Sequence, residues 1–358
     1  MVQIVQDKVA IVLGAGASKE FGLPTGGELS AQIIELLKTR TDHFRSWFVD
    51  SEFDRAIEVA IRDRVTSGGK QSLIKAARLL EENLSIAPSI DNFLHTHRSN
   101  TDIVWLGKLA IVFCLLRAEY RSILKVDPSN IHNRLNLKKC AETWVGRLFT
   151  QLAVAGDFEA FVDRLRKIYF VSFNYDRCVQ QFMSCAARQY FDLSETQVSS
   201  LLSNLNVHYI YGNIGPFIAK SAIDTSFGSN PSAENCIGLI PELQTFTEGQ
   251  DSNDQRVLDA YLNNSREIYF LGFGFNKLNL DRILPTSGLC ADSIFSTTKG
   301  VPETAVSQIR EELDGRIGKF LIDAKDARVR YDSARALFKN VSCGELIWEC
   351  QRNFQTSP

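Results

Sequence analysis

A glycine-rich turn follows an apolar run near the start of the chain. Residues 9–13 (VAIVL) have the pattern of a buried strand, GAGAS follows at 14–18, and a helix-forming stretch comes next. A helix that starts directly after such a turn directs backbone N–H groups toward an anion. Gly14 and Gly16 carry no Cβ, so the backbone can turn sharply and approach a ligand. The segment predicts a site for a phosphate or a pyrophosphate.

The spacing of the glycines excludes two common phosphate-binding motifs. Gly22 lies six residues after Gly16, whereas the dinucleotide fingerprint G-x-G-x-x-G needs a spacing of about three. No Lys-Ser or Lys-Thr pair follows the glycines, so the turn is not the phosphate loop of nucleoside triphosphatases.

The residues around this turn resemble the sirtuins. In that family G-A-G-x-S holds the NAD pyrophosphate, and a following G-(I/L)-P segment forms a flap over the ribose and nicotinamide. The chain then reads TGGEL in place of the Asp-Phe-Arg of deacylating sirtuins, which is similar to the sirtuin-like NAD hydrolases of bacterial antiphage defence. The resemblance implies that NAD is the substrate and that it contacts Gly14, Ala15, Gly16, Ser18, Leu23, Pro24 and Thr25.

A second polar cluster, SFNYD at 172–176, resembles the sirtuin T-x-N-x-D segment. By that resemblance Asn174 contacts the nicotinamide ribose and orders the attacking water, while Asp176 receives the carboxamide. Cleavage of the N-glycosidic bond develops positive charge at C1′, and a neutral amide can orient water there without a charge penalty. Without the resemblance, the same two residues could simply cap the helix that follows.

The third cluster, HYIYGN at 208–213, departs from the family pattern. Related proteins carry a histidine directly before the glycine that corresponds to Gly212, and it acts on the ribose hydroxyls. Here Tyr211 holds that position, and the nearest histidine, His208, lies on the opposite face of the strand because side chains alternate. Either His208 acts as the third catalytic residue through a bulge or shifted register, or Tyr211 replaces the histidine, or the base is lost. A phenol with a pKa of about 10 is a weak base at neutral pH but can hydrogen-bond a hydroxyl.

A fourth cluster, LGFGFNKLNL at 271–280, resembles the L-G-F-G-x-x-x-x-N-L segment of the defence proteins. There the glycines approach the adenosine half of NAD, so Gly272, Phe273 and Gly274 are expected to contact the substrate, as is Gly212. A purely structural turn is the alternative. SIDNFL at 89–94 also resembles a recurrent segment of the family; it is expected to dock a helix against the site, and no chemistry is assigned to Asp91.

The resemblance implies an NAD hydrolase that forms nicotinamide and ADP-ribose in abortive antiphage defence. Control by a partner protein from the same operon, by homo-oligomerisation, or by both is expected, since unregulated NAD loss would kill the host. The alternative is a regulatory or scaffold subunit that binds NAD without hydrolysing it, and Tyr211 is its main support. A deacylase is disfavoured because the eight cysteines include no C-x-x-C pair for the zinc ribbon of that class. No metal is expected.

The elements that would bring these clusters together indicate an α/β fold. Apolar runs at 167–175, 206–212 and 266–275 are typical of buried parallel strands. Together with 9–13 they predict a Rossmann-like doubly wound sheet, which binds ligands at the carboxyl ends of its strands. We expect an NAD-binding domain over 1–300 with a helical insertion at about 27–165, a Ser- and Asn-rich loop over 221–254, and a helical C-terminal extension over 301–358 packed on the domain.

The composition, 44% hydrophobic and 23% charged, is ordinary for a globular protein. A net charge of −2 lacks the basic excess of nucleic-acid-binding proteins, so no nucleic-acid partner is expected. The first residues show no secretory signal, and the longest apolar stretch, 103–116, is too short to span a bilayer. A cytoplasmic protein without membrane contact, with a buried helix at 103–116, is expected.

Overall fold

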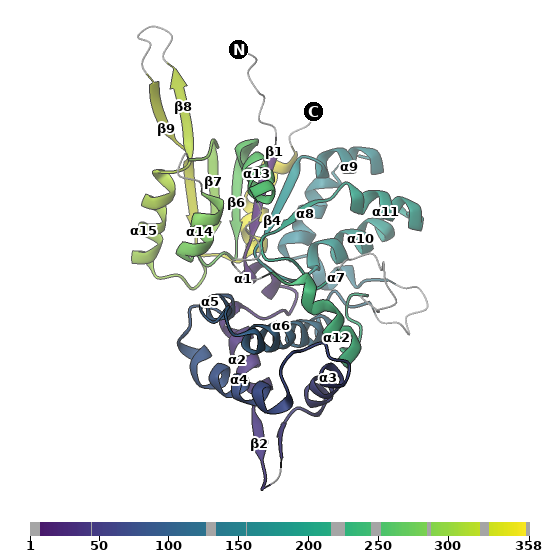
Figure 1. Cartoon of the computed structure of the whole chain (residues 1–358). Coiled ribbons are helices and arrows are strands. Elements are labelled where there is room, and N and C mark those ends of the chain that lie inside the picture. The colour runs from purple at the N-terminus through teal and green to yellow at the C-terminus, as the bar shows by residue number, and fades with distance from the viewer. Residues whose placement is uncertain are drawn as a thin grey trace.

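Six parallel strands form the central sheet in the computed structural model of the chain (Figure 1). The structure describes residues 8–43, 45–126, 134–154, 156–215, 226–244, 252–284, 288–322 and 329–355. The strand order is β10-β7-β6-β1-β4-β5. The strands are β1 (Lys8–Leu13), β4 (Ile168–Ser172), β5 (Asn206–Tyr209), β6 (Ser265–Leu271), β7 (Ser293–Thr297) and β10 (Arg335–Lys339). Counted along the chain from the β5 edge, this is the order 3-2-1-4-5-6 of the doubly wound dinucleotide-binding fold, so the predicted fold class is confirmed.

Both faces of the sheet are buried, which explains the continuous apolar runs of its central strands. Ala10 and Val12 of β1 enter one hydrophobic core, and Ile11 and Leu13 enter the other. The first core includes helices α13 (Ser252–Asn263), α14 (Lys277–Ile283) and α15 (Glu303–Asp314). The second includes α8 (Trp144–Leu152), α9 (Phe158–Leu165), α10 (Cys178–Phe191), α11 (Glu195–Ser203), α16 (Cys343–Glu349) and α17 (Gln351–Gln355).

The helical insertion builds a lobe beside the carboxyl ends of the strands (Figure 1). After α1 (Ala15–Lys19) it contains α2 (Gly26–Leu36), α3 (Ser51–Arg62), α4 (Lys70–Asn83), α5 (Ile90–Thr96), α6 (Thr101–Arg121) and a small hairpin of β2 (Thr39–Thr41) and β3 (Ser46–Phe48). Helix α6 is buried along most of its length, which confirms the predicted buried helix. The return segment, with α7 (Leu137–Cys140), α8 and α9, packs on the sheet instead of the lobe.

Two expectations for the later part of the chain need correction. The segment after residue 300 is mixed instead of helical: β8 (Gly318–Ile322) and β9 (Val329–Ser333) form a hairpin, and β10 pairs with β7 at the edge of the central sheet. Within residues 221–254, the described part contains α12 (Ala233–Leu239), which packs on α3 and α6, and the start of α13. Residues 221–225 and 245–251 lie outside the described ranges. The domain boundary at residue 300 stays a prediction.

None of the helices that the structure describes is both long enough and apolar enough to cross a membrane.

A buried ion pair joins the lobe to the sheet. Arg177 follows β4, Glu119 lies near the end of α6, and their side chains are 1% and 0% exposed. Two hydrogen bonds connect them, at 3.2 and 2.7 Å, and the backbone N–H of Gly228 also donates to Glu119. Burial raises the pKa of Glu119, and the guanidinium opposes that rise. The pair therefore fixes α6 against the segment that carries Asn174 and Asp176.

Replacement of Glu119 by glutamine should lower the free energy of unfolding by about 3–5 kcal/mol, because it removes the buried carboxylate with which the Arg177 guanidinium forms an ion pair. Chemical denaturation of the purified chain measures this difference. Glu35→Gln, which removes an exposed partner of Lys38, is the control and should give no resolvable change. Equal stability of the two variants would mean that the buried pair does not hold the lobe in place.

Candidate functional site

A cavity of about 830 Å³ opens at the carboxyl ends of the strands. Its lining comes from the segments that follow β1, β4, β5, β6, β7 and β10, and from α5 of the lobe. The strand order reverses between β1 and β6, and open α/β sheets bind ligands at such a switch point. The structure brings nine predicted site residues to this cavity: Gly14, Ala15, Gly16, Thr25, Asn174, Tyr211, Gly272, Phe273 and Gly274.

The glycines of the first turn pack against the turn that follows β6. The N–H of Gly16 donates to the carbonyl of Gly272 at 3.0 Å, and a Cβ on Gly14 would lie 2.4 Å from that same oxygen. Gly272 has a φ of +57°, and its own Cβ would lie 2.2 Å from the nitrogen of Ala17. The lack of a Cβ at Gly14 and Gly16 thus lets two loops of the protein approach each other, and both glycines also line the cavity.

Asn174 begins a series of hydrogen bonds in which each side chain donates to the next, from Asn174 to Ser18 and from Ser18 to Asp176. Its Nδ2 donates to the carbonyl of Gly14 at 2.8 Å and to Oγ of Ser18 at 2.9 Å, and that hydroxyl donates to Asp176. Because the Gly14 carbonyl can only accept, the orientation of the amide is settled. Within the described ranges no donor contacts Oδ1 of Asn174, which is therefore available to accept a hydrogen bond at the cavity wall.

A smaller recess of about 80 Å³ shares part of its lining with the cavity, including Ala15 and Asn174. The remaining residues of the predicted flap, Leu23 and Pro24, line this recess, as do Ser18 and Asp176. Asp176 also accepts a hydrogen bond from the N–H of Cys178 at 3.1 Å. Asp176 thus accepts the N–H of the first residue of α10 alongside the contact with Ser18, whereas Asn174 makes no bond to this helix.

Thr25, which follows the flap, starts α2 through a reciprocal capping box with Glu28. This cap explains why the helix begins there, at the cavity wall.

Tyr211 and His208 lie in different surroundings. Tyr211 is buried at the cavity wall, and its hydroxyl donates to Oδ1 of Asn279 at 2.7 Å. Burial, together with the nearby charge of Asp91, raises the pKa of this phenol above its ordinary value. His208 pairs with Val171 in the sheet and packs its ring against Tyr261. The structure does not bring His208 to the cavity, because strand alternation turns it to the other face.

Gly212 is a structural position. Its φ is +72°, and a Cβ there would lie 2.1 Å from the carbonyl of Glu242. The neighbouring Tyr211 carbonyl accepts from the N–H of Gln244. Gly212 does not line the cavity, and its lack of a side chain lets the segment after β5 cross the segment around residue 242.

The turn after β6 forms an aromatic part of the cavity wall. Phe273 is buried and packs against Phe173, with ring centroids 5.0 Å apart. The N–H of Gly272 donates to Oγ1 of Thr297 at 2.8 Å, which ties this turn to the end of β7. Asn276 then caps α14.

Sequence reasoning missed several lining residues. Asp91 and His95 reach the cavity from α5, Asn279 from α14, and Lys299 from the segment after β7. Ser89 caps α5, so the local sequence does encode the helix that carries Asp91. No local pattern encodes where that helix lies relative to Asn174, because the two segments are far apart in the chain.

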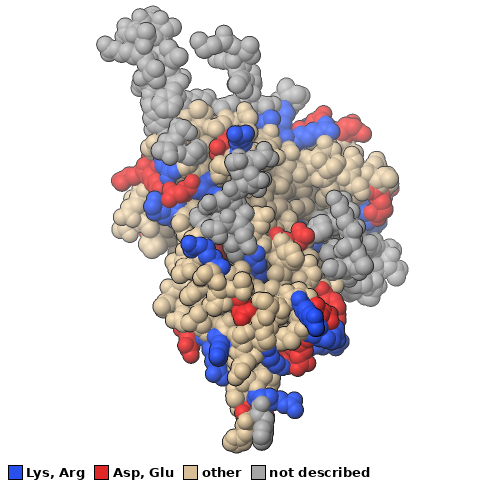
Figure 2. Space-filling view, viewed as in Figure 1, with Lys and Arg blue, Asp and Glu red and all other residues tan. Residues whose placement is uncertain are grey.

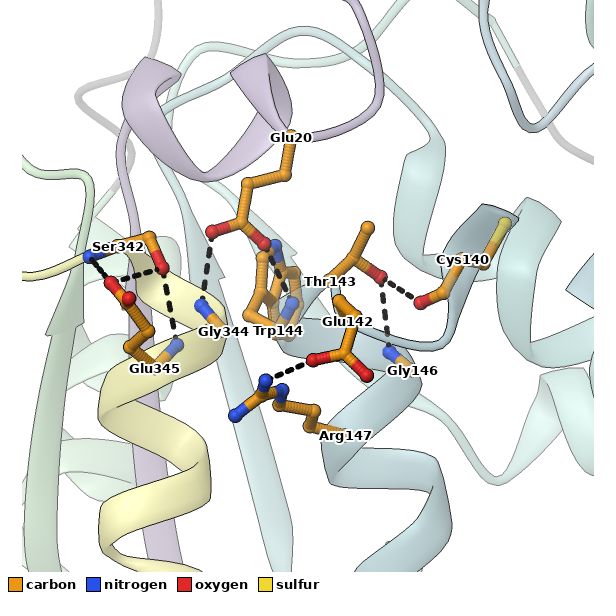
Figure 3. Close-up of polar contacts among 10 residues, drawn as sticks. All are labelled: Glu20, Cys140, Glu142, Thr143, Trp144, Gly146, Arg147, Ser342, Gly344 and Glu345. Atoms are coloured by element: carbon orange, nitrogen blue, oxygen red, sulfur yellow. Dashed lines mark hydrogen bonds and ion pairs between the residues drawn. The ribbon is translucent and has the colours of Figure 1, made fainter. Parts of the chain in front are cut away.

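Glu20, directly after α1, anchors the glycine-rich turn to two distant helices (Figure 3). One carboxylate oxygen accepts from the N–H of Trp144 at 2.7 Å and the other from the N–H of Gly344 at 2.9 Å, at the starts of α8 and α16. The indole of Trp144 also donates to the carbonyl of Ala17. Burial raises the pKa of Glu20, while the backbone hydrogen bonds oppose that rise. One side chain thus connects α1 to two helices from distant parts of the sequence.

Acidic and basic side chains are interspersed on the face shown in Figure 2, and neither sign dominates it. Among the described residues, no group of three or more His, Cys, Asp or Glu side chains is arranged to hold a metal ion.

No protein-family model matches the chain, and a search of curated proteins finds no match either.

Glu20→Ala should lower the free energy of unfolding by about 2–3 kcal/mol, because two buried backbone N–H groups lose a charged acceptor. Thermal and chemical denaturation measure the difference. Glu142→Ala serves as the control, since its carboxylate is 82% exposed and pairs only with Arg147 (Figure 3); it should leave stability unchanged. A Glu20 variant as stable as this control would contradict the anchoring role.

Proposed function

We propose that the chain is an NAD hydrolase, which cleaves NAD to nicotinamide and ADP-ribose with water as the acceptor. The observation that carries the proposal is the Asn174 amide, held by Gly14 and Ser18 with its Oδ1 available at the cavity wall. Combined with the sirtuin-like sequence around both segments, this arrangement supports a site built to orient a water molecule.

In the proposed complex, the nicotinamide end of NAD enters the recess beside Asn174 and Asp176. The pyrophosphate lies at the first turn, near Ala15, and the adenosine half extends along Gly272 and Gly274 toward the segment after β7. A cavity of about 830 Å³ is within the range of cofactor sites. Asp176 would accept a hydrogen bond from the carboxamide once that group displaces or shares the contact with Ser18.

The proposed reaction forms no covalent bond between the substrate and the protein. As the bond between C1′ and the pyridinium nitrogen lengthens, positive charge develops on the ribose. Oδ1 of Asn174 accepts one hydrogen of the attacking water and holds its oxygen toward C1′, a contribution from orientation and fixed dipoles. The leaving group departs as neutral nicotinamide and therefore needs no proton.

The second candidate is a subunit that binds NAD without hydrolysing it. The observation in its favour is Tyr211, which occupies the position of the family histidine and donates its hydroxyl to Asn279. A buried phenol with a raised pKa is a poor base. Such a subunit would retain the NAD-binding residues and would not hydrolyse NAD.

We further propose that the protein acts in antiphage defence, with activity restrained until a partner protein or a change in oligomeric state releases it. The sequence resemblance supports this role. Restraint is also expected physically, because constant NAD hydrolysis would be lethal to the cell that makes the enzyme.

Asn174→Ala should reduce kcat for NAD hydrolysis by about 10²–10³-fold, since it removes the dipole that orients the attacking water. Release of nicotinamide, or fluorescence from an etheno-NAD substrate, measures the rate of the full chain, alone and with the products of neighbouring genes. Asn83→Ala, at the far end of α4, is the control and should keep full activity.

Equal turnover by Asn174→Ala and the wild-type chain would contradict the proposed mechanism. NAD binding by the wild-type chain without turnover under every activating condition would instead favour the binding subunit.

A further inference from the structure

We propose that Asp91 is the general base of this reaction, taking the proton of the water that Asn174 orients. The inference rests on the proposed NAD hydrolysis and assigns the residue that replaces the missing histidine. Asp91 and Asn174 both line the cavity, and both also line the recess. Asp91 reaches this shared space from α5, and Asn174 reaches it from the segment after β4.

The position of Asp91 is set by contacts on both sides. Ser89 caps α5 by accepting from the N–H of Asn92 at 3.1 Å, which fixes the first turn of the helix that carries Asp91. The hydroxyl of Tyr175 donates to Oδ1 of Asp91. Because Tyr175 is the chain neighbour of Asn174, this hydrogen bond ties Asp91 to the segment that holds the amide.

Burial raises the pKa of Asp91, and the Tyr175 hydrogen bond partly opposes the rise. A carboxylate with a raised pKa is a stronger base than an exposed one. The hydrogen bond from Tyr175 occupies Oδ1. The backbone N–H of Asp91 also donates to this carboxylate, whose two oxygens keep further lone pairs that can receive a proton.

The other titratable side chains that line the cavity do not line the recess. Both carboxylate oxygens of Glu20 accept backbone N–H groups. Tyr211 donates to Asn279, and His208 does not line the cavity. His95 lies one turn beyond Asp91 on α5 and lines the cavity without lining the recess. Asp91 is thus the acid that shares both spaces with the amide.

The step balances without a further reactant. The bond between C1′ and the pyridinium nitrogen breaks, and its electron pair passes to that nitrogen, which gives neutral nicotinamide. The water oxygen forms the new bond to C1′, and its proton transfers to the carboxylate of Asp91. The carboxylic acid then releases this proton to solvent, which regenerates the base for the next turnover.

The test measures NAD hydrolysis and NAD binding by the full chain, under the conditions in which the wild-type chain is active. Asp91→Asn keeps the shape and an acceptor for Tyr175, and it should lower kcat by about 10²–10³-fold; its Kd for NAD should stay within about threefold. Asp91→Ala should lose as much activity and regain at least tenfold when formate is added as a small external base. A residue with only a structural role would show no such rescue.

Asp163→Asn is the matched control, since it makes the same chemical change at a carboxylate that is 69% exposed and lines neither the cavity nor the recess; it should retain full activity. Asp91→Asn with near-wild-type kcat, or Asp91→Ala without formate rescue, overturns the proposal. If Asn174→Ala is inactive in that same assay, NAD hydrolysis stands while the assignment of Asp91 fails. If the wild-type chain never hydrolyses NAD, both the proposed function and the assignment of Asp91 are wrong.

Discussion

The contact between the turn after β1 and the turn after β6 is the constraint on which the site depends. Strand order reverses between these two strands, so the helices that follow them leave toward opposite faces of the sheet. A crevice opens at such a point only if the two turns stay narrow. Gly14, Gly16 and Gly272 achieve this, since a Cβ on any of them would overlap the backbone of the other turn. With the turns in place, Asn174 can reach the carbonyl of Gly14 from the next strand.

Two carboxylates, one partly buried and one fully buried, extend this constraint to the rest of the fold. Glu20 ties the first turn to α8 and α16, which lie on one face of the sheet. Glu119 ties α6 of the lobe to Arg177, directly after Asp176. Both carboxylates are expensive to bury and are offset by charged or backbone hydrogen bonds. The geometry of the cavity therefore depends on how α6, α8 and α16 pack, as well as on the loops at its edge.

The sequence predicts the parts of this arrangement that local pattern encodes. The runs of β1, β4 and β6 are rich in β-branched and aromatic residues, and side-chain alternation separates His208 from Tyr211, which follows β5. Strands β7 and β10 were not predicted because SIFST and RALFK are only about half apolar. Helix α12 lies in a Ser- and Asn-rich region and packs on α3 and α6, a tertiary contact with no local signal. The resemblance of residues 89–94 predicts a helix docked at the site, and the structure places α5 at the cavity, but no local pattern indicates chemistry for its side chains.

Under the proposed function, Tyr211 stands where a histidine is expected, and this has a consequence for the lobe. Tyr211 donates to Asn279 and so joins the segments after β5 and β6, a contact that holds the wall in place but supplies no base. Under the proposal for Asp91, the base comes from α5, and the water-orienting amide comes from the sheet. Under that proposal, hydrolysis requires the lobe and the sheet to keep a fixed separation, because the base and the amide act on the same water. A shift of the lobe by about an ångström would move the base relative to that water and so lower kcat.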